Sequence, residues 1–153
     1  MDVIKSALVA YIHYLSFMVC YGALIFERIS LKESPNKKEA ISMVIADVIY
    51  GIAGIALLIS GIYRVIKFGQ GTDFYTQNPI FWSKIILFAL VGSLSLYPTV
   101  TYILWAIPLT KGNLPIVSTN LVKRLKLMIN IELIGFSFIP LLATFMSRGY
   151  GLA

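Results

Sequence analysis

Residues 41–66 read ISMVIADVIYGIAGIALLISGIYRVI and contain only two charged side chains, Asp47 and Arg64. A helix needs about 20 apolar residues to cross the roughly 30 Å of hydrocarbon in a bilayer. Lipid offers the backbone no hydrogen-bond partner, so a continuous apolar run of this kind predicts a helix rather than a strand. The segment therefore indicates an integral membrane protein.

Three other apolar runs repeat this pattern. The four predicted membrane spans lie at about residues 3–26, 41–66, 80–107 and 127–146. We expect an all-α fold, an integral membrane four-helix antiparallel bundle built from one transmembrane domain that covers residues 1–153. The composition agrees, because 58% of the residues are hydrophobic and 13% are charged, whereas about 25% are charged in a typical soluble domain.

The basic residues predict the orientation in the membrane. The loops at residues 27–40 and 108–126 together carry eight of the 13 Lys and Arg residues. The opposite side of the membrane has the remaining five basic residues, which are Lys5, Arg64, Lys67, Lys84 and Arg148. Because cytoplasmic loops carry the excess of basic residues, we expect a multi-pass protein with both termini on the non-cytoplasmic side.

The formal net charge of +6 bears on the partners of the chain. In a membrane protein such an excess favours contact with the anionic headgroups of the lipid bilayer. The basic residues are scattered over loops instead of forming one face, which argues against binding to nucleic acid. The single cysteine, Cys20, excludes an internal disulfide and a cysteine-ligated metal centre within one chain.

Two tryptophans bracket the third predicted span. Trp82 and Trp105 are separated by 23 positions, or about 34 Å along a helix. This spacing predicts that each Trp lies at one membrane interface. Pro98 and Pro140 lie inside the third and fourth spans, where neighbouring helices make proline tolerable.

Ionisable side chains inside the spans are the candidates for chemistry, since each costs about 2.5–3.5 kcal/mol to insert on translocon scales. His13, the only histidine, lies in the middle of the first span. Helical spacing can bring such residues onto one stripe of each helix. The stripes carry His13 and Glu27 in the first span, Asp47 and Arg64 in the second, Lys84 in the third and Glu132 in the fourth. We expect Glu27, Asp47 and Glu132 to be polar residues of the bundle interior.

One arrangement accounts for this layout, a b-type haem with His13 as its axial metal ligand. Neutral imidazole is a common haem ligand. Arg64 and Lys84 would bind the two propionates through charge-assisted hydrogen bonds. Gly54 and Gly61 would make room for the flat ring, and aromatic residues of the first and third spans, such as Phe17 and Phe88, would complete the pocket wall.

Simpler roles exist for the same residues. His13 could hydrogen-bond a neighbouring helix, and the glycines could serve close helix packing. The carboxylates could form a proton route or interhelical contacts. For a haem, the second axial position stays open between Met128, no ligand at all, and His13 of a second subunit.

A bacterial membrane-protein family known only as domain of unknown function 2214 resembles this chain in four segments. The segments are YIHYLSFMVCYGALIFER (11–28), DVIYGIAGIALLISGIYRV (47–65), NPIFWSKIILFALVGSLSLYPT (78–99) and NIELIGFSFIPLLATFMSRGYG (130–151). Distinctive pieces are the histidine of the first span, the arginine that ends the second and the N-P-x-F-W-x-K motif that opens the third. The resemblance implies a membrane protein and brings no established activity.

A weaker likeness extends to the HemJ-type protoporphyrinogen oxidases and to copper-resistance membrane proteins, which are also small helical bundles. The HemJ type carries a histidine in its first helix, a lysine after a Trp and an Asn-Glu pair that opens its final helix. His13, the run Trp82-Ser83-Lys84 and the run Asn130-Ile131-Glu132 are similar to these features, although here an isoleucine splits the pair. This resemblance implies binding of haem or another tetrapyrrole.

Three functions are therefore open. The first is a haem-binding or tetrapyrrole-binding protein with a redox role. The second is a non-enzymatic accessory subunit or assembly factor of a larger membrane complex. The third is a small transporter, which would need to form a homo-oligomer because one four-helix unit holds no inverted repeat. No enzyme class follows, since the phosphate-binding, zinc-protease and serine-hydrolase motifs are absent.

The distribution of basic residues gives a direct test of orientation. A cysteine introduced into the loop around Asn36 is expected to react with a membrane-impermeant thiol reagent only after the cells are permeabilised, because this loop is predicted to be cytoplasmic. Labelling of the same site in intact cells would contradict the predicted orientation.

Overall fold

The computed structural model describes residues 2–151, and within this range the chain forms helices and no strand. The helices are α1 (Asp2–Ser30), α2 (Lys37–Ile66), α3 (Thr72–Thr76), α4 (Pro79–Thr110) and α5 (Thr119–Ser147). All except the short α3 are long and apolar enough to cross a membrane. The predicted all-α membrane fold is confirmed.

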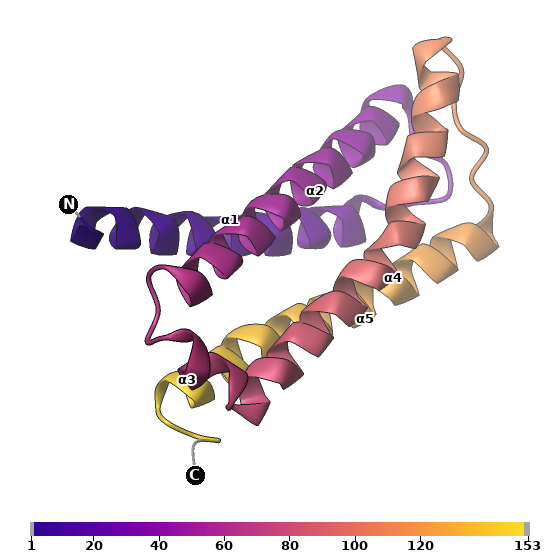
Figure 1. Ribbon diagram of the computed structural model, residues 1–153. Helices are drawn as coiled ribbons and strands as arrows, with labels where there is room; N and C mark the ends of the chain where they lie inside the picture. The colour runs from indigo at the N-terminus through magenta and orange to yellow at the C-terminus, as the bar shows by residue number, and fades with distance from the viewer. Residues whose placement is uncertain (1, 152–153) are drawn as a thin grey trace.

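The four long helices form two antiparallel hairpins, α1–α2 and α4–α5 (Figure 1). Helix α1 contacts α2 and α5, and α4 contacts the same two helices, whereas the described residues show no close approach of α1 to α4. The helices therefore surround a common centre in the order α1, α2, α4, α5. Towards its N-terminus α1 diverges from α4 and α5 (Figure 1).

Polar caps determine where the helices begin. The Asn36 side chain accepts a hydrogen bond from the Glu39 N–H at 3.0 Å, and the Glu39 carboxylate accepts one from the Asn36 N–H at 2.8 Å. Asn78 caps α4, and Ser118 caps α5. Each cap satisfies a backbone N–H that has no partner inside its own helix.

The fifth helix is longer than the predicted fourth span. It begins at Thr119, whereas the apolar run was expected to begin near residue 127. Hydropathy detects only the apolar part of a helix, but the Ser118 cap starts α5 in its polar part. The three basic residues at 123–126 consequently lie on the first turns of α5 and not in a loop.

The short helix α3 lies inside the predicted loop at 67–79 and fixes the start of α4. The Trp82 indole N–H donates to the Thr76 carbonyl at 2.9 Å. The Asn78 amide N–H donates to the Tyr150 carbonyl at 2.9 Å, which ties the chain beyond α5 to the same corner. The α3 region, the start of α4 and the end of the described chain therefore form one end of the bundle.

Trp105, one of the two tryptophans predicted to lie at a membrane interface, is buried between helices. Its side chain is only 4% exposed and packs edge-on against Tyr102, with ring centroids 5.3 Å apart. Trp82 remains 49% exposed. Helix α4 continues past Trp105 to Thr110, so this Trp lies within the helix packing and not at its edge.

Gly135 allows α4 and α5 to approach closely. A Cβ atom at this position would lie 2.5 Å from the Val91 Cγ2 atom. Real side chains do not tolerate such a distance, so the two helices would have to move apart or Val91 would have to repack.

We expect Gly135→Ala to lower the free energy of unfolding by about 1–3 kcal/mol, the usual cost of overpacking.

Thermal unfolding in mild detergent measures this effect. Gly92→Ala is the matched control, because a Cβ there meets no atom within 4 Å and alanine favours the helix over glycine. The double variant Gly135→Ala with Val91→Ala should recover much of the lost stability. Equal unfolding temperatures for Gly135→Ala and Gly92→Ala would contradict this account of the packing.

Candidate functional site

The polar residues of the long helices gather in two groups. One group surrounds His13 at the end of the bundle where α2 finishes and α4 begins. We call it the His13 group, and its members are His13, Ser60, Gly61, Arg64 and Lys84. The other, which we call the carboxylate cluster, comprises Glu27, Asp47, Tyr50, Tyr102 and Glu132.

His13 is held by α2 through one ring nitrogen. Its Nδ1 atom lies 3.1 Å from the Leu57 carbonyl oxygen and 3.0 Å from the Ser60 Oγ atom. A carbonyl only accepts, so Nδ1 carries the proton and donates it. The Ser60 hydroxyl donates in turn to the Ala56 carbonyl at 2.6 Å. The half-buried imidazole therefore leaves Nε2 as a free acceptor, with no hydrogen bond to any described residue.

Gly61 permits this contact between α1 and α2. A Cβ atom at Gly61 would lie 3.2 Å from the His13 Cε1 atom. The face of Gly61 that was expected to receive a haem ring is thus occupied by the imidazole itself. Gly54 differs, because a Cβ there would meet no atom within 4 Å.

Two cations lie near the imidazole. The Arg64 Nη2 atom donates to the Tyr14 hydroxyl at 3.2 Å, and its guanidinium lies 5.0 Å from the centroid of the same ring. The Lys84 Nζ atom lies 5.4 Å from the Phe81 ring centroid. Both cations are close enough for their charges to act on His13. The one salt bridge among the described residues joins Lys32 and Glu39. Neither cation of the His13 group is therefore paired with an acid.

The possible second haem ligand Met128 lies at the wrong level of the bundle. The Arg28 Nε atom donates to the Asn130 side-chain oxygen at 2.6 Å, which aligns this part of α5 with the end of α1. His13 precedes Arg28 by 15 positions, or about 22 Å along the helix. The structure therefore separates Met128 from His13.

The carboxylate cluster lies in the bundle centre. Glu27 is 1% exposed, Asp47 6% and Glu132 0%, and the three come from α1, α2 and α5. The Tyr50 hydroxyl donates to Glu132 Oε2 at 3.5 Å, and Thr99 donates to Asp47 Oδ1 at 2.8 Å. All three acids are thus interior residues, and two of them bond a side chain of another helix.

Several buried polar atoms of the carboxylate cluster have no hydrogen-bond partner. They are Glu27 Oε1, Glu132 Oε1 and the Tyr102 hydroxyl. The sequence pattern did not identify Tyr50 and Tyr102 as members of the group. Tyr50 follows Asp47 by three positions and therefore shares its helix face. This spacing could have identified Tyr50, whereas nothing in the sequence distinguishes Tyr102.

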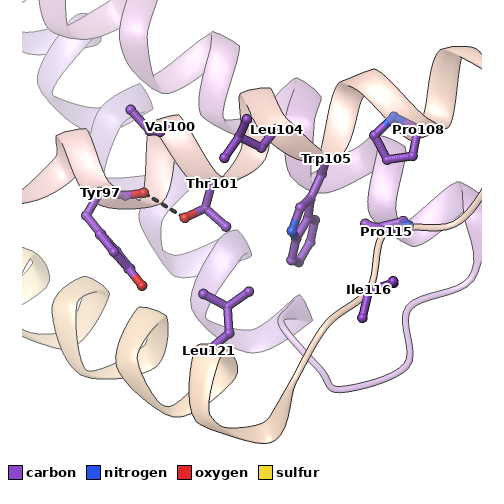
Figure 2. Close-up of a pocket in the computed structure, with 9 residues that line it drawn as sticks. All are labelled: Tyr97, Val100, Thr101, Leu104, Trp105, Pro108, Pro115, Ile116 and Leu121. Atoms are coloured by element: carbon purple, nitrogen blue, oxygen red, sulfur yellow. Dashed lines mark hydrogen bonds between the residues drawn. The ribbon is translucent and has the colours of Figure 1, made fainter.

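Two cavities of the described residues are lined by members of neither group. Figure 2 shows one of about 440 Å³ between the second half of α4, the segment at Pro115 and Ile116, and Leu121 of α5. Another, of about 450 Å³, lies between α1 and α2 and includes Val19 and Ile49. Neither is lined by His13. The described residues also contain no group of three His, Cys, Asp or Glu side chains placed to hold one metal ion.

Phe17, which was expected to form part of the haem pocket wall, packs against two other aromatic rings. Its ring lies 5.5 Å from the Phe136 ring and 6.3 Å from the Tyr21 ring. Phe88, expected on the same wall, packs against the apolar core. These contacts place both rings in the bundle packing.

A family model described as predicted membrane protein (DUF2214) matches residues 5–151. No curated protein and no solved structure matches the chain significantly. The family match and the four long apolar helices agree on a multi-pass protein of the lipid bilayer.

The contact between Tyr50 and Glu132 predicts unequal effects of two substitutions. Glu132→Gln keeps an acceptor for the Tyr50 hydroxyl, whereas Glu132→Leu leaves this buried hydroxyl without its partner. We expect the Leu variant to be less stable than the Gln variant by about 1–3 kcal/mol, the usual cost of an unsatisfied buried group. Thermal unfolding in detergent gives the comparison. The same pair of changes at exposed Glu33 is the control, and equal stabilities of the two Glu132 variants would refute the role of this bond.

Proposed function

The chain belongs to the DUF2214 family of predicted membrane proteins, and we propose that it binds a b-type haem or a related tetrapyrrole and has a redox role in the membrane. The state of His13 carries this proposal. Its Nδ1–H is fixed by the Leu57 carbonyl and Ser60, and Nε2 is free to bind a metal. Metal-ligating histidines typically donate their other ring N–H to a carbonyl or carboxylate, which fixes the tautomer and raises ligand basicity.

The two nearby cations supply the second element of the proposal. Arg64 and Lys84 have no acidic partner among the described residues, and both act electrostatically on His13. A tetrapyrrole with two propionates would bring the missing negative charges, and charge-assisted hydrogen bonds to carboxylates are strong. In the predicted orientation both cations would face the non-cytoplasmic side.

The surroundings of His13 limit where a haem ring would lie. Gly61 is covered by the imidazole, so the ring would lie on the side of His13 away from α2. The first half of α1 diverges from α4 and α5 (Figure 1). When bound, the haem iron supplies one-electron transfer. This chain would provide one axial ligand and two anchors for the propionates.

Among residues 2–151, none is identified that would occupy the second axial position. The sequence contains no other histidine, and Met128 lies at a different level. We propose that this position is either left open or filled by His13 of a second copy. The second arrangement would make the protein a homo-oligomer around a shared haem.

An absorption spectrum of the protein purified in mild detergent tests the proposal. We expect a Soret band that His13→Ala abolishes and that added imidazole partly restores in His13→Gly, because free imidazole can replace the ligand. Ser60→Ala should retain the band, since the Leu57 carbonyl still holds Nδ1. Lys84→Met should lower the haem content, whereas Lys67→Met, which changes an exposed lysine outside the His13 group, should not. A spectrum without a His13-dependent Soret band would refute haem binding.

The alternative is a non-enzymatic accessory subunit or assembly factor of a larger membrane complex. It is favoured by one observation, the absence of His13 from the two described cavities. In that role His13 would serve only to join α1 to α2. The chain would then co-purify with a stoichiometric partner and without a tetrapyrrole, and migration as an isolated monomer in mild detergent would argue against it.

A further inference from the structure

We propose that the carboxylate cluster is a buried proton-binding site in which Glu27 and Glu132 hold exchangeable protons, with the Tyr50 hydroxyl bonded to Glu132 and the unpartnered Tyr102 hydroxyl beside the acids. This inference concerns residues other than the His13 group and does not depend on haem binding.

The residues of the cluster converge from all four long helices. Each helix contributes at least one titratable group, and the groups are Glu27 from α1, Asp47 and Tyr50 from α2, Tyr102 from α4 and Glu132 from α5. The charges of Asp47 and Glu132 act on Glu27, and all three acids act on Tyr102. The cluster is therefore one interacting group and not a set of isolated buried residues.

No described cation compensates the charge of these acids. The nearest basic residue on α1, Arg28, directs its Nε atom at the Asn130 side chain. The salt bridge of the described residues, Lys32–Glu39, lies at the exposed start of α2. Three buried carboxylates without a counter-ion are strongly unfavourable in a medium of low dielectric constant. Neutralisation by bound protons or by a bound cation removes this cost.

The geometry favours protons over a metal cation. The described residues provide no group of three acidic, His or Cys side chains that could coordinate one ion. The partnerless atoms also match a protonated site. Glu27 Oε1 and Glu132 Oε1 are acceptors without a donor, and the Tyr102 hydroxyl is a donor without an acceptor. A proton on either glutamate removes its charge and converts an acceptor-only group into a donor, and a tyrosine hydroxyl oxygen can accept as well as donate.

The remaining titratable neighbour is Cys20 of α1. Its thiol is fully buried and donates to the Tyr50 carbonyl at 3.7 Å. This bond leaves the thiol outside the proton exchange that we propose for the two glutamates.

Infrared spectroscopy of the purified full-length protein tests the proposal. At neutral pH we expect an absorption of protonated carboxylic acid that shifts on exchange into D₂O and disappears reversibly as the pH rises. Glu27→Gln and Glu132→Gln should each weaken this absorption, and the double variant should remove most of it, because glutamine keeps the side-chain shape but binds no proton. Glu33→Gln, which changes an exposed acid outside the helices, should leave it unchanged.

A conservative tyrosine variant keeps the test informative if a glutamate variant fails to fold. Tyr102→Phe removes a buried hydroxyl that has no partner, so it should fold and should shift the carboxylic-acid absorption. Tyr97→Phe, a more exposed position on the same helix, should not shift it. The proposal is overturned if the wild type shows no such absorption, or if the absorption is as strong in both glutamine variants and in the double variant as in the wild type. Stabilisation of the wild type by Na⁺ or K⁺ that Glu132→Gln abolishes would also overturn it, by identifying a metal cation as the ligand.

Discussion

Hydrocarbon offers no hydrogen-bond partner, and this constraint sets how the long helices of the protein contact one another. Three of the four neighbouring helix pairs are joined by polar side chains that satisfy each other. The bonds are His13–Ser60 between α1 and α2, Asp47–Thr99 between α2 and α4, and Arg28–Asn130 and Tyr21–Ser137 between α1 and α5. The fourth pair, α4 and α5, instead packs closely at Gly135. The same bonds that hold the bundle together thus fix the register in which its functional candidates meet.

This register places the cations of the His13 group and the buried acids at different levels of the bundle. The cations Arg64 and Lys84 lie near His13 at one end, while the three buried acids lie in the centre and towards the other end. If the acids and the cations served only to stabilise the bundle, pairing them with each other would cost less free energy, since an unpaired charge in a membrane is costly. Their separation leaves the cations available to an anionic ligand and the acids available to protons. This separation is the physical basis of both proposals.

The candidate site could be predicted from the sequence only in part. The residue types and their helical stripes identified His13, Arg64 and Lys84, and the structure brings them to one end of the bundle. The role of Gly61 was predicted differently, because sequence spacing shows that a glycine leaves room but not what fills it. The imidazole fills it here. Tyr102 could not be predicted as a member of the cluster, because aromatic residues are common in membrane helices. Its hydroxyl becomes significant only because the fold places three acids near it.

The sequence by itself determined the membrane class, the number of long helices and their alternating direction, because these follow from the length of each apolar run and from the short connections between them. It also placed the ionisable residues on particular helix faces through the periodicity of the helix. Only the tertiary structure decided which faces meet. It paired His13 with Ser60, left Nε2 free, separated Met128 from His13 and gathered the acids from three helices. Rotation and register of one helix against another depend on the side-chain packing of the whole bundle, and no single segment contains that information.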